Sequence, residues 1–171
     1  MDNAITKKIL FEIEQIDQLI NDSSPLLNLC NLREPDFVER CGIALILQSF
    51  YNGIENIVVL IMKNKGNILF DGTKWHKNLL SKTFENNENE YQIFREELKV
   101  PLNDYLQFRH FVRHTYGFQL KWEKMKNLFF ARLIPTRALC LPMTSDLTRM
   151  SLRILCCLHL RLFRRLIFSL Y

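Results

Sequence analysis

The chain has no cysteine motif that binds a metal or builds a disulfide framework. It contains five cysteines, and none belongs to a C-x-x-C pair or to a Cys/His pair at zinc-finger spacing. Because the count is odd and no secretory signal is recognisable, we expect reduced thiols in a cytoplasmic protein, where cysteine packs as a small hydrophobic residue. A disulfide-stabilised scaffold and a zinc finger are thereby excluded.

The sequence also lacks a cluster of Asp, Glu and His residues at the spacing of metal ligands. A metal-dependent enzyme is therefore disfavoured, and we expect neither a metal nor another cofactor. With 171 residues, of which 48% are hydrophobic and 24% charged, the chain has the size and composition of one soluble globular domain.

Residues 133–171 contain neither lysine nor glutamate. They hold six arginines against Asp146 alone, whereas residues 1–132 hold 17 Lys plus Arg and 17 Asp plus Glu. The net charge of +5 is therefore a property of this tail and indicates no general affinity for nucleic acid. Arginines interrupt its apolar run before roughly 18 uncharged residues accumulate, so we expect no membrane span, although a basic helix on a membrane surface stays open. We hypothesise that residues 133–171 are translated out of frame or otherwise foreign to a helical domain formed by residues 1–132.

Apolar residues recur at helical spacing along most of that domain. Isoleucines at intervals of three and four predict a helix over residues 5–21, and a turn at residues 21–25 should end it. Asp36 is the predicted cap of a second helix, which reaches about residue 64 and carries two neighbouring apolar stripes. This helix should lie at the centre of a bundle or share one stripe with another subunit. Gly53 in its middle costs roughly 1 kcal/mol relative to alanine, which suggests close helix packing.

Shorter helical segments follow. Thr73 is a plausible cap for a helix at residues 75–80, where we interpret His76 as a structural or surface histidine. Residues 85–90 should form a mobile polar connector, and residues 92–99 a short helical piece. Pro101 suits the first turn of a helix predicted over residues 102–116, which Gly117 should close in the left-handed conformation before a last helix at residues 118–132. The sequence thus predicts an all-α antiparallel bundle of four to five helices.

The stretch from residue 105 to residue 122 contains no Asp or Glu, so its basic residues are locally unopposed. Within it Arg109, His114 and Tyr116 form the pattern R-x4-H-x-Y. A guanidinium can grip two phosphate oxygens, and an imidazole can move protons near neutral pH, so the pair suits a phosphodiester. Taken alone, the spacing is more typical of an amphipathic helix with solvated arginines and a hydrogen-bonded histidine.

Three stretches together carry more information than this spacing. FYNGIENI at residues 50–57, WHKNLL at residues 75–80 and YLQFRHFVRHTYGFQLKWEKM at residues 105–125 resemble the HepT-like ribonuclease toxins of the HEPN superfamily, in order and in separation. The resemblance covers most of residues 37–128. It implies a HEPN-like bundle, metal-independent RNA cleavage and a site completed by a homodimer. It also suggests that Asn52, Glu55 and Asn56 line a polar cleft, for which a solvated helix face is the alternative.

The resemblance implies roles for five residues. His114 would be the general base or acid, Arg109 the clamp on the transition state, and His110 an orienting residue. Arg113 would bind a flanking phosphate, or remain a solvated arginine. Tyr116 would accept AMP from an MntA-type nucleotidyltransferase antitoxin, or simply close the helix with its ring on the core. The competing classes are a non-catalytic HEPN-type binding or dimerisation module and an inactive copy with a damaged C-terminus.

Overall fold

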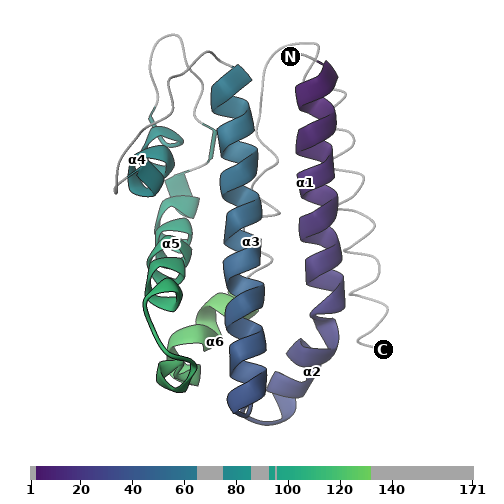
Figure 1. The fold of residues 1–171 in the computed structure, drawn as a ribbon, viewed down its shortest axis with the longest axis vertical. Helices are drawn as coiled ribbons and strands as arrows, with labels where there is room; N and C mark the ends of the chain where they lie inside the picture. Colours follow the sequence, from purple (N-terminus) through teal and green to yellow (C-terminus); the bar gives the residue numbers. More distant parts are fainter. Residues whose placement is uncertain (1–2, 65–74, 86–92, 95, 132–171) are drawn as a thin grey trace.

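The computed structural model describes residues 3–64, 75–85, 93–94 and 96–131, and every regular element in these ranges is helical. The α-helices are α1 (Asn3–Asp22), α2 (Ser24–Leu32), α3 (Phe37–Asn64), α4 (Trp75–Lys82), α5 (Lys99–Arg113) and α6 (Trp122–Ala131), and two 3₁₀ turns are η1 (Glu96–Leu98) and η2 (Gly117–Gln119). Helices α1, α3 and α5 lie side by side with alternating direction (Figure 1). The predicted all-α antiparallel bundle is confirmed.

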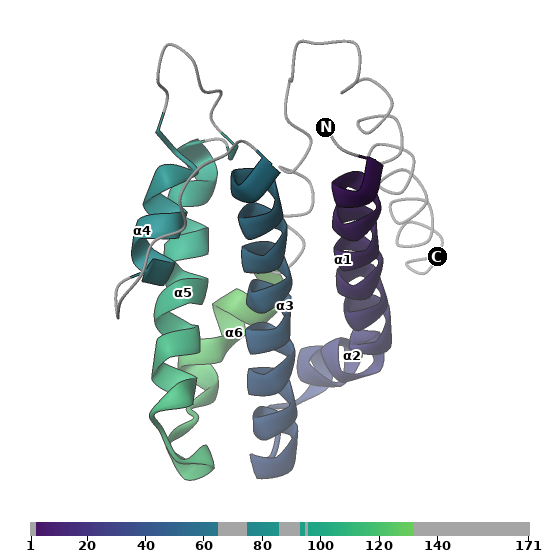
Figure 2. The same ribbon diagram turned by 45° about the horizontal axis from the view of Figure 1, so that its top comes forward.

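Helix α3 is the central element of this bundle. It packs against α1 on one side and α5 on the other, while α6 passes behind it (Figure 2). Its two predicted apolar stripes supply much of the core, including Ile43, Leu47, Phe50 and Tyr51, each at most 1% exposed. Of the helices in the described ranges, only α3 is long and apolar enough to cross a membrane, and its burial between neighbouring helices accounts for that composition.

Two features predicted for α3, the Asp36 cap and close packing at Gly53, are present in the structure. At its start, Asp36 Oδ1 accepts a hydrogen bond from the Glu39 N–H at 2.8 Å, and Glu39 Oε2 accepts one from the Asp36 N–H at 2.7 Å. This reciprocal pair is a capping box. In the middle of α3, a Cβ at Gly53 would lie 2.7 Å from Ile16 Cγ1, so glycine lets α1 approach closely. The predicted packing reason for Gly53 is confirmed.

The turn predicted at residues 21–25 is much shorter than expected. Only Ser23 separates α1 from α2, and its hydroxyl donates a hydrogen bond to the Ile20 carbonyl at 2.9 Å. Pro25 occupies the first turn of α2, where its missing N–H needs no partner. The sequence predicted that Pro25 would lie in the turn that ends the first helix, whereas in the structure it lies in the first turn of the next helix.

The helix that carries the motif ends earlier than predicted. Helix α5 begins at Lys99 with Pro101 in its first turn, and it stops at Arg113 instead of residue 116. Tyr116 has an extended backbone (φ −85°, ψ 149°), and α6 begins at Trp122 instead of residue 118. The prediction that Gly117 closes α5 as a left-handed cap is therefore wrong.

Gly117 has a packing role in place of the predicted capping role. It begins η2, and a Cβ there would lie 3.1 Å from Cys41 Sγ, so a side chain would push the turn away from α3. Cys30 and Cys41, the cysteines in the described ranges, form no disulfide there. The predicted Thr73 cap, residues 86–90 of the connector predicted at residues 85–90, and the tail at residues 133–171 lie outside the described residues.

Candidate functional site

Helices α4 and α5 border an open groove of about 980 Å³. Four of the five residues singled out in the sequence line it: Arg109, His110, Arg113 and His114. Helix α4 contributes Trp75, His76 and Lys77 to the opposite wall, and it packs beside the first half of α5 (Figure 1). The locally acid-free stretch of the sequence therefore forms one side of a basic, histidine-rich groove.

Three side chains from neighbouring helices hold the guanidinium of Arg109 in place. Its Nε donates a hydrogen bond to Asn52 Oδ1 at 2.7 Å, and its Nη1 lies 3.1 Å from His76 Nε2. Its Nη2 forms an ion pair with Glu55 Oε2 at 3.4 Å. Only 13% of the Arg109 side chain is exposed. These partners come from α3 and α4, so the guanidinium is fixed by three helices and not by α5 alone.

The hydrogen bonds define the protonation state of His76. Arginine only donates, so His76 Nε2 must accept from Arg109, and the ring proton must sit on Nδ1. His76 Nδ1 then donates to Glu55 Oε1 at 2.8 Å. Burial, followed by the positive charges of Arg109 and Arg113, lowers the pKa of His76 to about 4. His76 is therefore neutral at pH 7.

Glu55 is the buried acid of the site, with 6% of its surface exposed. Burial raises its pKa to about 7, although Arg109, Arg113 and a hydrogen bond with Tyr51 favour the ionised form. Burial also raises the pKa of Tyr51. A carboxyl that titrates near neutrality thus lies directly behind the arginine of the groove.

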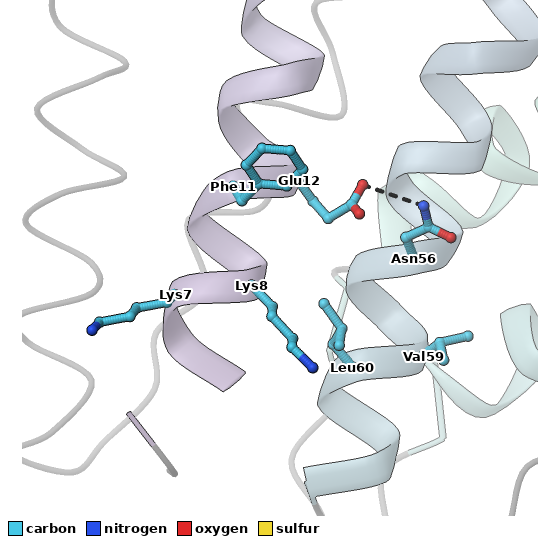
Figure 3. Close-up of a pocket in the computed structure, with 7 residues that line it drawn as sticks. All are labelled: Lys7, Lys8, Phe11, Glu12, Asn56, Val59 and Leu60. Carbon is cyan, nitrogen blue, oxygen red and sulfur yellow. Dashed lines mark hydrogen bonds between the residues drawn. The ribbon is translucent and has the colours of Figure 1, made fainter. Parts of the chain in front are cut away.

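Asn56 belongs to a different part of the surface. Its Nδ2 donates a hydrogen bond to Glu12 Oε2 on α1 at 3.2 Å, at the edge of a separate hollow of about 500 Å³ between α1 and α3 (Figure 3). Of the three polar residues that the resemblance placed on one cleft, only Asn52 and Glu55 contact Arg109.

His110 and His114 lie one turn apart on the groove wall. Their ring centroids are 4.7 Å apart in an edge-to-face arrangement, and both residues are exposed. Arg113 is exposed beside them. The groove thus presents the imidazoles of His110 and His114 and the guanidinium groups of Arg109 and Arg113. The guanidinium groups can bind phosphate oxygens, and the imidazoles can transfer protons. In the described residues, no group of three or more His, Cys, Asp or Glu residues is arranged to hold a metal ion.

Comparison with known proteins identifies the family. A family model described as HepT-like protein matches residues 42–137, which is more than half of the chain and includes α4, α5 and α6. The chain belongs to the HepT-like family. No curated protein and no solved structure matches it.

In this HepT-like protein, Tyr116 lies apart from the groove residues. It follows the end of α5, does not line the groove, and is 73% exposed. Its ring stacks on Phe118 at 5.6 Å between centroids, with 7° between the planes. Because α5 ends at Arg113, Tyr116 does not lie on the helix that carries Arg109, although the sequence predicted that this helix would reach residue 116. Its ring does not pack on the core, and its hydroxyl is reachable from solvent.

The residue that sequence reasoning missed in this HepT-like site is His76. The interpretation as a structural or surface histidine did not foresee that it joins Glu55 to Arg109. The available signal was the WHKNLL stretch, which already formed part of the family resemblance.

Proposed function

We propose that this HepT-like protein acts in the cytoplasm as the toxin of a toxin–antitoxin system and cleaves RNA as a metal-independent endoribonuclease. The observation that carries the proposal is the groove lined by Arg109, which Asn52, His76 and Glu55 hold in place, and by His114. Family membership supports a ribonuclease-type HEPN domain.

The proposed reaction is an internal transesterification. The ribose 2′-oxygen attacks the neighbouring phosphorus, the O2′–P bond forms, and the P–O5′ bond breaks to leave a 2′,3′-cyclic phosphate and a 5′-hydroxyl. One group must take the 2′ proton, another must protonate the leaving oxygen, and a cation must stabilise the charge on the phosphoryl oxygens. We assign the proton transfer to His114 and the charge stabilisation to Arg109. His110 orients the site, and Arg113 binds a flanking phosphate.

We further propose that the active species is a homodimer. In this assignment His110 orients the site, so one protomer supplies a single proton-transferring residue, His114, whereas the reaction needs both a base and an acid. Two copies related by a two-fold axis would bring two such histidines to one phosphodiester.

Tyr116 is the proposed acceptor of AMP from an MntA-type nucleotidyltransferase antitoxin. Its high exposure and its position two residues beyond His114 support this role. Transfer of AMP from ATP to its hydroxyl, with release of pyrophosphate, would add a negatively charged group two residues beyond His114, which would repel RNA phosphate approaching the groove.

The decisive experiment is RNA cleavage in EDTA by the wild type, Arg109→Ala and His114→Ala. Lys126→Ala, which removes an exposed cation on α6 away from the groove, is the control. We expect cleavage in EDTA by the wild type and by the control, and at least about a hundredfold loss in both groove variants. Equal residual activity in all four proteins would indicate contamination and favour a non-catalytic HEPN-type binding module or an inactive copy.

A further inference from the structure

His76 connects two charged residues that come from different helices. It lies on α4 and contacts Glu55 of α3 through Nδ1 at 2.8 Å and Arg109 of α5 through Nε2 at 3.1 Å. Its side chain is 18% exposed at the wall of the groove. Sequence separations of 21 and 33 residues show that this junction arises only through the fold.

The orientation of the imidazole is fixed independently of these two bonds. The ring of Trp75 lies against it, with centroids 3.6 Å apart and 33° between the planes. Leu79, one turn later on α4, is 2% exposed and anchors this short helix in the core. The ring therefore presents its two nitrogens in set directions, as a positioning group must.

Besides its hydrogen bond with Tyr51, the carboxylate of Glu55 contacts His76 and Arg109 through different oxygens. Oε1 accepts from His76, and Oε2 lies 3.4 Å from Arg109 Nη2. A free carboxylate would pair with both terminal nitrogens of a guanidinium at once, which is the most favourable geometry for this pair. With one oxygen held by His76, the arginine is prevented from turning fully toward Glu55.

From these contacts we propose that His76 is a positioning residue for Arg109: as a neutral Nδ1–H imidazole it holds Glu55 on one side and accepts from the guanidinium on the other. This inference rests on the proposed ribonuclease function of the groove. A guanidinium has five N–H groups, and Asn52, His76 and Glu55 engage three of them. These three partners leave one N–H group on each terminal nitrogen, and because Arg109 lines the groove we assign these two groups to phosphate binding.

The kinetic test compares His76→Ala with His76→Gln. A glutamine can accept from Arg109 through its carbonyl and donate to Glu55 through its amide, so it preserves the donor and acceptor pattern. We expect a fall in kcat of about tenfold or more for His76→Ala, with KM changed less than about threefold, and recovery to within about threefold of wild type for His76→Gln. Asn78→Ala, an exposed neighbour on α4, is the matched control and should leave both constants unchanged.

A double-mutant comparison separates positioning from general damage. In the Arg109→Ala background, His76→Ala should cause no further loss, since the residue acts through Arg109. An additional tenfold loss there, or a His76→Gln variant as defective as His76→Ala, would overturn the inference. If His76→Ala does not fold, His76→Asn takes its place. Asparagine reaches Glu55 but is too short to accept a hydrogen bond from Arg109. The His76→Asn variant should therefore be defective, while His76→Gln should be active.

Hydrogen exchange at Arg109 tests the positioning role of His76 without relying on RNA cleavage. The Arg109 Nε–H proton is hydrogen-bonded to Asn52, so its nitrogen-15 NMR signal, assigned by its absence in Arg109→Ala, should exchange slowly with water. Exchange should accelerate about tenfold or more in His76→Ala and stay slow in His76→Gln. Absence of cleavage by the wild type with this exchange pattern would refute only the proposed function. Unchanged exchange in His76→Ala would refute the positioning role.

Discussion

Replacing Glu55 by glutamine tests whether burial or the neighbouring arginines dominate the site. Its pKa is raised from 4.5 to about 7, first by burial, against the opposing attraction of Arg109 and Arg113. The folded chain therefore binds the Glu55 proton more tightly than the unfolded chain does. The stability contributed by the protonated carboxyl is fully present below pH 4.5 and is lost as the pH rises to about 7. A shift of this size corresponds to about 3 kcal/mol, and only 8% of the side chain is exposed to solvent screening.

His76 contributes a pH dependence of opposite sign. Its pKa is lowered from 6.5 to about 4, so the unfolded chain binds the proton more tightly, and stability rises between pH 4 and pH 6.5. The two contributions oppose each other in the wild type between pH 4.5 and pH 6.5. Each single substitution exposes the contribution of the other residue.

Urea unfolding, followed by far-ultraviolet circular dichroism from pH 4 to pH 8, measures both effects. The free energy of unfolding of the wild type minus that of Glu55→Gln should fall by about 3 kcal/mol between pH 4.5 and pH 7. The corresponding difference for His76→Gln should rise between pH 4 and pH 6.5. Subtraction removes the contribution of titrating groups that do not contact the substituted residue. A Glu55→Gln difference that rises with pH would mean that attraction by the arginines outweighs burial, and the reasoning would fail.

Three further predictions follow from the geometry. Gly53→Ala should destabilise the fold by about 1–3 kcal/mol in urea unfolding, because its Cβ would lie 2.7 Å from a side chain of α1. A Cβ at Gly42 on the same helix meets nothing within 4 Å, so Gly42→Ala should stabilise the fold by up to about 1 kcal/mol. Arg113→Ala should reduce the salt dependence of binding to a non-cleavable 2′-deoxy oligonucleotide by about one phosphate contact, a slope change of about 0.7, which Lys126→Ala should not reproduce. Affinity for that oligonucleotide should rise severalfold from pH 8 to pH 6, and Glu55→Gln should make this rise smaller, because neutralising the buried carboxyl leaves more positive charge for phosphate.

The fold was largely predictable from local signals. The spacing of apolar residues gave α1 and α3, and the Asp36 cap and the close packing at Gly53 are both seen. The predicted helix ends were wrong where one residue type can play two different structural roles. Pro25 starts a helix as readily as it ends one, and Gly117 avoids a contact with Cys41 instead of adopting a left-handed conformation.

The site was only half predictable, because helical periodicity fixes the angle between side chains and not the neighbour that each one meets. Asn52, Glu55 and Asn56 lie within about 100° of one another on α3. Two of them turn toward α5 and the third turns toward α1, and this division depends on where the flanking helices pack. His76 was beyond such reasoning altogether. Its role requires a buried acid on α3 and a donor on α5 to converge on α4, and a histidine in that position gains its function from two partners that are distant in sequence.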